Sequence, residues 1–199
     1  MNYGIIISYI IAGFLMITIL TVNYNVNYSN QEVTTTLNKT THEKAIKEML
    51  IHDIPKIGYE RKTVLATKFA KADSNELSFF SNIDDTLAIE QVTWKYTDTP
   101  APGSKNPNDH ILKRTVDGDA TEITFGVTAF KFTYYESYGS NTPMSTPVSS
   151  SKFDDIVQIE VEMQLQSDYQ LAYRPSDSGE YIKTNWSKRF SPVNLRPNK

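Results

Sequence analysis

Three patterns of hydrophobic and polar residues follow one another along the 199-residue chain, and the first predicts a membrane-spanning helix. Residues 4–22 are apolar apart from Ser8, Thr18 and Thr21, and no Asp, Glu, Lys or Arg precedes Glu32. A helix rises about 1.5 Å per residue, so this run supplies roughly 28 Å of helix, enough to cross the hydrocarbon core of a bilayer. Because no charge flanks it closely, the positive-inside rule does not orient it.

A cleaved secretory signal is the alternative interpretation of this run. However, the run is longer than the hydrophobic region of about 7–15 residues found in such signals. The polar segment Asn23-Tyr24-Asn25 follows it, rather than a small-x-small cleavage site. We therefore expect a retained single-pass anchor in the inner or cytoplasmic membrane, with the rest of the chain on the extracytoplasmic side.

The second pattern has helical spacing. Apolar residues recur at three- and four-residue steps with charges between them, namely Val33, Leu37, Ala45, Ile46, Met49 and Leu50. The pattern stops at Pro55 and Gly58, a common helix-ending pair. It predicts one long helix from about Gly4 to Ile54, loosened at the Asn-rich run 23–30, whose second half lays one apolar stripe on a domain.

The third pattern, from Thr63 onward, has the two-residue period of strands. It predicts strands at 76–83, 89–97, 111–116, 121–125, 127–136, 156–166 and 185–194. Two apolar faces stand out and are expected to share one core with Ile46 and Leu50: Phe130, Phe132 and Tyr134 in one strand, and Val157, Ile159, Val161, Met163 and Leu165 in another. Asp117-Gly118 predicts a tight hairpin turn.

Together these patterns predict an α+β fold, in which a long N-terminal helix packs on an antiparallel sheet. Residues 1–22 form a short leader and the transmembrane helix, 23–55 extend that helix, and 56–199 form a β-rich globular domain. A fragment beginning near Pro55 is expected to be soluble. The segment Gly139–Ser151 is long, polar and Pro-containing, and we expect it to be a mobile loop.

Composition narrows the possible functions. The chain has no Cys, which excludes disulfides, thiolate metal sites and cysteine nucleophiles. Its net charge of −3 is unlike the basic surplus of nucleic-acid binders, so no nucleic-acid partner is expected. The 12 Tyr and 9 Phe suit a β-rich core.

Several short motifs, taken in order, resemble those of type IV pilin-like proteins, in particular minor pilins and J-type minor pseudopilins. A membrane helix continuing into an amphipathic helix and then a sheet is their general layout. The segments that carry the resemblance are Asp53 to Tyr59 (DIPKIGY), Glu76 to Phe79 (ELSF), Ile89 to Tyr96 (IEQVTWKY), Leu112 to Gly118 (LKRTVDG), Gly126 to Gly139 (GVTAFKFTYYESYG), Ile156 to Leu165 and Phe190 to Leu195 (FSPVNL). The stretch from Gly126 is the most specific, and the set covers most of residues 4–195.

The resemblance implies a structural subunit of a type IV pilus or a type II secretion-like filament, with other pilin-like subunits and the lipid bilayer as partners. It places the processing site at Gly4 and Ile5. Tyr9 then occupies the fifth mature position, where the family normally has a Glu that neutralises a neighbour's terminal amine. Tip-position pseudopilins of the K type also lack this Glu, so the departure favours a role in initiation or at the filament tip.

Helix packing in the membrane has its own candidates. Ser8, Ala12 and Gly13 are small residues that permit close approach of a neighbouring helix, and Tyr9 lies among them. These residues are the candidate helix-packing site.

No pattern in the chain predicts an enzyme or a cofactor. His42 and Glu43 begin a zinc-protease motif, but Ile46 stands where its second His belongs. We therefore expect structural roles for His42, His52 and His110. Acidic pairs at 84–85, 117/119 and 154–155 are isolated at strand ends, where Asp favours turns, so we expect no calcium site.

Two other functions remain open from the sequence. One is a single-pass, membrane-anchored extracytoplasmic binding module that uses the Gly139–Ser151 loop. The other is an anchored hydrolase, which is the weakest because no nucleophile, base and orienting group converge.

Overall fold

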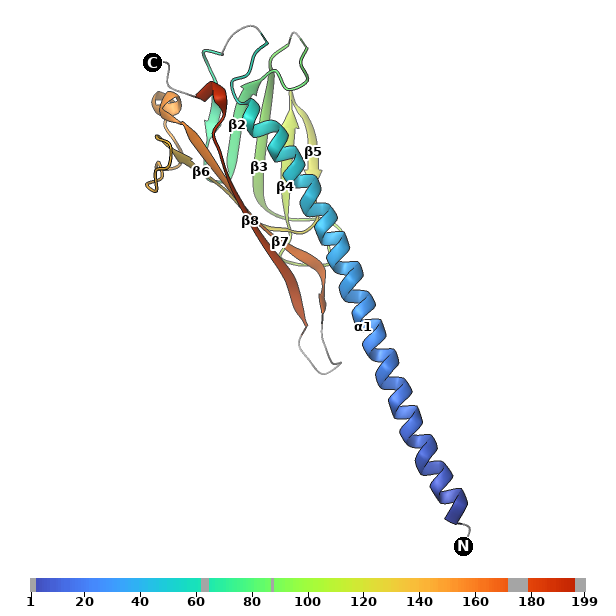
Figure 1. Cartoon of the computed structure of the whole chain (residues 1–199). Coiled ribbons are helices and arrows are strands. Elements are labelled where there is room, and N and C mark those ends of the chain that lie inside the picture. The colour runs from blue at the N-terminus through green and yellow to red at the C-terminus, as the bar shows by residue number, and fades with distance from the viewer. Residues whose placement is uncertain (1–2, 62–64, 87, 172–178, 196–199) are drawn as a thin grey trace.

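The computed structural model describes residues 3–61, 65–86, 88–171 and 179–195. A single helix, α1 (Tyr3–Asp53), makes up its first 51 described residues and is followed by the short 3-10 turn η1 (Ile54–Lys56). The Asn-rich run 23–30 does not interrupt α1. In Figure 1 the C-terminal part of α1 lies on the domain, and its N-terminal part extends far beyond it.

Eight strands form the domain in two antiparallel sheets. The first sheet has the order β1-β2-β3-β4-β5 and the second the order β6-β7-β8. The strands are β1 (Phe69–Ala72), β2 (Glu76–Ser81), β3 (Glu90–Pro100), β4 (His110–Val116), β5 (Asp119–Ile123), β6 (Val127–Tyr135), β7 (Gln158–Leu171) and β8 (Glu180–Phe190). Two further 3-10 turns are η2 (Ser150–Asp155) and η3 (Val193–Leu195). The α+β prediction is confirmed, but the single expected sheet is in fact two.

The seven expected strands are all present, with shifted ends. The structure adds the four-residue strand β1, and β8 begins five residues before the expected start at Asn185. Asp117 and Gly118 form the β4–β5 turn with φ of 47° and 93°. Positive φ at both central residues is the geometry of the tight hairpin turn that these residue types favour.

One hydrophobic core joins α1 to both sheets. Ile46 and Leu50 are fully buried there with Phe132 and Tyr134 from β6. The predicted apolar face of 157–165 is confirmed, since none of its five residues is more than 4 % exposed. Trp94 on β3 is the largest fully buried side chain.

The single apolar stripe expected on the second half of α1 is wrong. Val33 and Leu37 are 57 % and 61 % exposed, whereas Ile46 and Leu50 are fully buried. Ile46 lies nine positions after Leu37, and at about 100° per residue the two lie half a turn apart around the helix. The helix therefore carries two apolar faces, one packed on the domain and one directed away from it.

Buried polar groups in the loop between β3 and β4 join the first sheet to the second. Asp109, in the loop between β3 and β4, accepts hydrogen bonds from the Ser104 hydroxyl at 2.6 Å and from the Gly126 amide at 2.9 Å. Asn106 donates to the Gln166 side chain at 3.2 Å across the same junction. Burial raises the pKa of Asp109. This loop therefore fixes the first sheet to the start of β6 and to β7.

The expected soluble fragment beginning near Pro55 would not keep this core. Ile46, Leu50 and Asp53 are fully buried and belong to α1, so a cut near Pro55 removes part of the core. The globular unit begins inside the helix, near Lys39, which is the first buried residue of α1.

Candidate functional site

The residues singled out for processing and helix packing all lie on the exposed N-terminal turns of α1. Gly4, Ile5, Ser8, Tyr9, Ala12 and Gly13 are within the helix and contact no part of the domain. Tyr9 is 75 % exposed. A Cβ atom added at Gly13 would meet nothing within 4 Å, so within one chain there is no steric reason for a glycine there.

The polar side chains of the apolar run are satisfied inside the helix. Ser8 donates to the Gly4 carbonyl, Thr18 to the Phe14 carbonyl and Thr21 to the Ile17 carbonyl, each at 2.9 Å. In lipid a polar group without a partner is costly, and these back-bonds remove that cost. Among the described residues, α1 is the helix long and apolar enough to cross a membrane, and its most apolar window has no buried residue.

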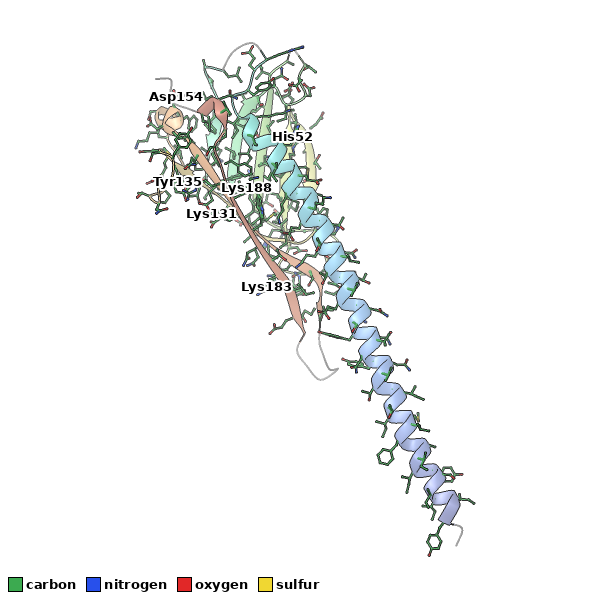
Figure 2. The ribbon with its side chains drawn as sticks, viewed as in Figure 1. His52, Lys131, Tyr135, Asp154, Lys183 and Lys188 are labelled. Atoms are coloured by element: carbon green, nitrogen blue, oxygen red, sulfur yellow. The ribbon has the colours of Figure 1, made fainter. Side chains whose placement is uncertain are left out.

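An exposed apolar seam runs along the face of α1 opposite the domain. Its members follow one another at steps of three or four residues, except for one step of seven between Val26 and Val33. They are Ser8, Ala12, Leu15, Ile19, Val22, Val26, Val33 and Leu37. The six large residues are between 52 % and 61 % exposed. Figure 2 shows the N-terminal part of α1 extending beyond the domain with its side chains exposed. This spacing is that of helices which pack along one another, so the seam fits a neighbouring helix.

The seam extends well past the apolar run of residues 4–22. Leu37 lies 15 residues beyond Val22, which corresponds to about 22 Å along the helix axis. Val33 and Leu37 therefore expose apolar surface to water in the isolated chain. Exposed apolar residues gathered on one face of a helix in this way are typical of an interaction surface.

At the other end, a buried carboxylate fixes α1 to the first sheet. Asp53 is fully buried and accepts hydrogen bonds from Trp94 Nε1 at 2.9 Å and from Arg114 Nε and Nη2 at 2.6 and 2.9 Å. His52 Nδ1 lies 3.0 Å from the second oxygen of Asp53. The paired, bidentate geometry is the one that makes a buried charge tolerable. The helix end is thus held rigidly to β3 and β4.

A second set of contacts holds the helix against β8. Lys39 is buried and donates to the Thr184 hydroxyl. The Lys47 ammonium lies 5.6 Å from the centre of the Trp186 ring, an attractive cation–π arrangement. Lys39 and Asp53 are the first and last buried residues of α1, so the domain holds the helix along the stretch between them.

Each of the three histidines contacts a neighbouring group. The His42 ring packs on Phe125 with centroids 4.0 Å apart, and His110 lies 2.9 Å from the Asn108 carbonyl. Within the part of the chain that the structure describes, no three His, Cys, Asp or Glu side chains gather in a group that could hold a metal ion. Of the acidic pairs, Asp84 caps the Thr86 amide at 3.0 Å and Asp117 accepts from the Gln91 amide at 2.8 Å, which are turn roles.

The Gly139–Ser151 segment is tied to the domain at three points, which does not support its expected mobility. The Met144 amide donates to the Tyr134 carbonyl and the Val148 amide to the Ala72 carbonyl, each at 2.8 Å. Arg189 donates to the Ser140 carbonyl at 2.8 Å. Val148 is itself buried.

Sequence reasoning missed a polar cluster on the outer face of the second sheet. Glu160 accepts hydrogen bonds from the Tyr135 hydroxyl at 2.6 Å, from Arg189 at 3.0 Å and from Ser187 at 2.9 Å. The hydrogen bond from Tyr135, with those from Arg189 and Ser187, lowers the pKa of Glu160. The sequence around Glu160 does not predict this cluster, because the three partners come from two other strands: Tyr135 from β6, and Ser187 and Arg189 from β8.

No family model matches the chain, and no curated protein or solved structure is significantly similar to it.

Proposed function

We propose that this chain is a minor structural subunit of a type IV pilus or type II secretion-like filament. It is anchored by residues 4–22 and assembles through α1 with other pilin-like subunits. The observation that carries the proposal is the exposed seam from Ser8 to Leu37. Its apolar residues extend from the run 4–22 through Val26 to Val33 and Leu37, with one polar turn at Ser29 and Asn30, on the face opposite the domain.

A simple membrane anchor does not need this seam. A tether has only to cross the bilayer, and its extension into water gains nothing from exposed Val33 and Leu37. A filament built by packing long helices side by side needs one helix that crosses the bilayer and also exposes apolar residues to a neighbouring helix beyond it. The rigid attachment through Asp53 supports the same function, since it gives each subunit a fixed angle between helix and domain.

The N-terminal residues favour a position at the filament tip. No carboxylate lies among the first 31 residues, and Tyr9 stands where the resemblance expects Glu. A terminal amine released at Ile5 can pair with a neighbour's Glu, but this chain offers no carboxylate in return. A subunit that offers an amine but no carboxylate can form this ion pair with a neighbour on one side only, as a subunit at the end of a filament does.

The mature N-terminus, determined by mass spectrometry of protein from native membranes, tests this proposal. We expect a new amine at Ile5, with Met1 to Gly4 removed. An intact Met1 would instead favour the anchored binding module. The attached state of the Gly139–Ser151 segment gives that second function no specific support.

A further inference from the structure

The exposed seam of α1 contains two rows of residues, and each row has a period of seven. The first row is wholly apolar and consists of Ala12, Ile19, Val26 and Val33. The second row stands three residues later and consists of Leu15, Val22 and Ser29, with Ser8 at its start. Two rows with this spacing are the pattern of helices that wind along each other, in which residues of both rows insert between those of the partner helix.

The composition of the rows indicates what kind of helix covers them. In parallel coiled coils, Ile or Val in one row and Leu in the row three residues later favour contact between two helices. Ile19, Val26 and Val33 occupy the first of these rows here. Neither row has a charged side chain, so a partner that placed Lys, Arg, Asp or Glu against it would bury a charge without a counter-charge. The seam therefore fits a parallel helix with an uncharged face.

Ser29 is the polar residue of these rows that lies beyond the apolar run of residues 4–22. Ser8, the other serine, donates to the Gly4 carbonyl at 2.9 Å and is satisfied inside the helix. Ser29 is exposed, and its hydroxyl makes no hydrogen bond with any residue that the structure describes. A helix that covers the seam removes water from this hydroxyl and has to supply a hydrogen-bonding group in its place.

Apolar spacing alone does not fix how far two such helices are shifted along each other. A shift of seven residues, about 10 Å of helix, keeps Ile19, Val26 and Val33 in contact with residues of the same kind. Subunits of a helical filament are offset along its axis, so a common depth of their anchors does not fix the shift either. One polar residue in an apolar row selects a single register in coiled coils, because other registers bury its polar group against apolar side chains.

We infer that Ser29 sets the register of the neighbouring subunit and restricts which subunit binds the seam. The partner is a parallel helix whose facing side is uncharged and carries one hydroxyl or amide side chain at the level of Ser29. The inference rests on the proposed function, because it concerns the same seam. Since Asp53 fixes α1 to the domain, the register of the two helices also determines the offset between their domains along the filament.

The test uses the full-length protein in detergent micelles and a designed helix as the probe. The probe repeats the two rows of the seam with Val at the level of Ser29. It is made in three forms: wholly apolar, with one Asn at the level of Ser29, and with that Asn moved seven residues toward the C-terminus. Because the chain has no Cys, one nitroxide can be placed by Glu48→Cys, where the side chain is 67 % exposed, and a second at the C-terminal end of the probe. Pulsed electron paramagnetic resonance then measures the distance between them.

We expect several distances with the apolar probe and one with the probe whose Asn stands at the level of Ser29. Moving the Asn by seven residues should shift that distance by about 10 Å, because the probe slides until its Asn meets Ser29. Ser29→Leu should abolish this dependence on the position of the Asn. Asn38→Leu, a similar change at an exposed position of α1 outside the two rows, should preserve it. Circular dichroism should show that both variants are folded.

The same measurement separates failure of this inference from failure of the proposed function. Distances that do not follow the Asn, or that still follow it in Ser29→Leu, overturn the inference and leave the seam and the proposed function standing. An antiparallel probe, whose label would lie about 60 Å along the helix from position 48, overturns it as well. If no form of the probe binds, the seam is not a helix-packing surface, and the proposed function is overturned with the inference.

Discussion

Replacing Asp53 with Asn should separate the end of α1 from the first sheet. The change keeps the shape of the side chain but removes its charge, so Arg114 loses its bidentate partner and Trp94 loses its charged acceptor. The carboxylate is fully buried and the Arg114 side chain is only 21 % exposed, so water cannot replace the lost partner well.

The expected cost is large. Breaking a buried ion pair by changing one partner typically costs about 3–5 kcal/mol. Domains of this size lose about 2–4 °C of melting temperature per kcal/mol, so we expect a decrease of roughly 6–20 °C. Such a loss is a substantial part of a total stability of about 5–15 kcal/mol.

Urea unfolding of the detergent-solubilised protein, followed by circular dichroism, measures this difference. Glu48→Gln is the control on the same helix, because the Glu48 side chain is 67 % exposed and its pairing with Lys44 spans 3.7 Å. That variant should change the free energy of unfolding by less than about 1 kcal/mol. If Asp53→Asn costs no more than the control, the buried network does not hold the helix to the domain, and the rigid attachment proposed for assembly is wrong.

Three further predictions follow from the packing and the polar cluster. Ile159→Ala should cost about 2–5 kcal/mol in urea unfolding, whereas Glu162→Ala on the exposed face of the same strand should be nearly neutral, and equal costs would refute the assigned faces. A fragment beginning at Asn30 should be soluble and cooperatively folded, and one beginning at Pro55 should aggregate, as size-exclusion chromatography will show. Since the pKa of Glu160 is lowered in the folded protein, its contribution to stability is present at neutral pH and is lost as the pH falls through that lowered pKa. Glu160→Gln should therefore reduce stability at pH 7 and flatten its acid dependence, and a variant whose unfolding free energy follows the parent at every pH contradicts this assignment.

Local patterns in the sequence predicted the elements of the fold well. The alternation from Val157 to Leu165 determines a buried face by itself, because side chains of a strand alternate strictly between its two sides. The Asp117-Gly118 pair likewise predicts its turn, since few residues tolerate positive φ. The strand β1 was missed because Phe69–Ala72 is too short to show a period.

Contacts between distant parts of the chain were beyond these patterns. Asp53 ends a helix in the sequence, and nothing local indicates that Trp94 and Arg114, 41 and 61 residues away, converge on it. The orientation of Val33 and Leu37 was wrong for a related reason. Three- and four-residue spacing alone predicts one stripe, whereas the step of nine positions from Leu37 to Ile46 moves the pattern to the opposite side of the helix. The exposed seam, which carries the functional proposal, became visible only in three dimensions.

Disulfide cross-linking in native membranes tests the proposed assembly most directly. The chain has no native Cys, so Leu37→Cys reports contacts of the seam. Asn38→Cys is a control that is also exposed but lies about 100° away around the helix. Each variant is paired with single-Cys variants of the subunits that co-purify with it. Leu37→Cys should then give disulfide-linked hetero-dimers, whose second chain mass spectrometry should identify as pilin-like. Asn38→Cys should give few such hetero-dimers. If both variants remain monomeric, or cross-link equally, the seam is not an assembly surface and the proposed filament subunit is contradicted.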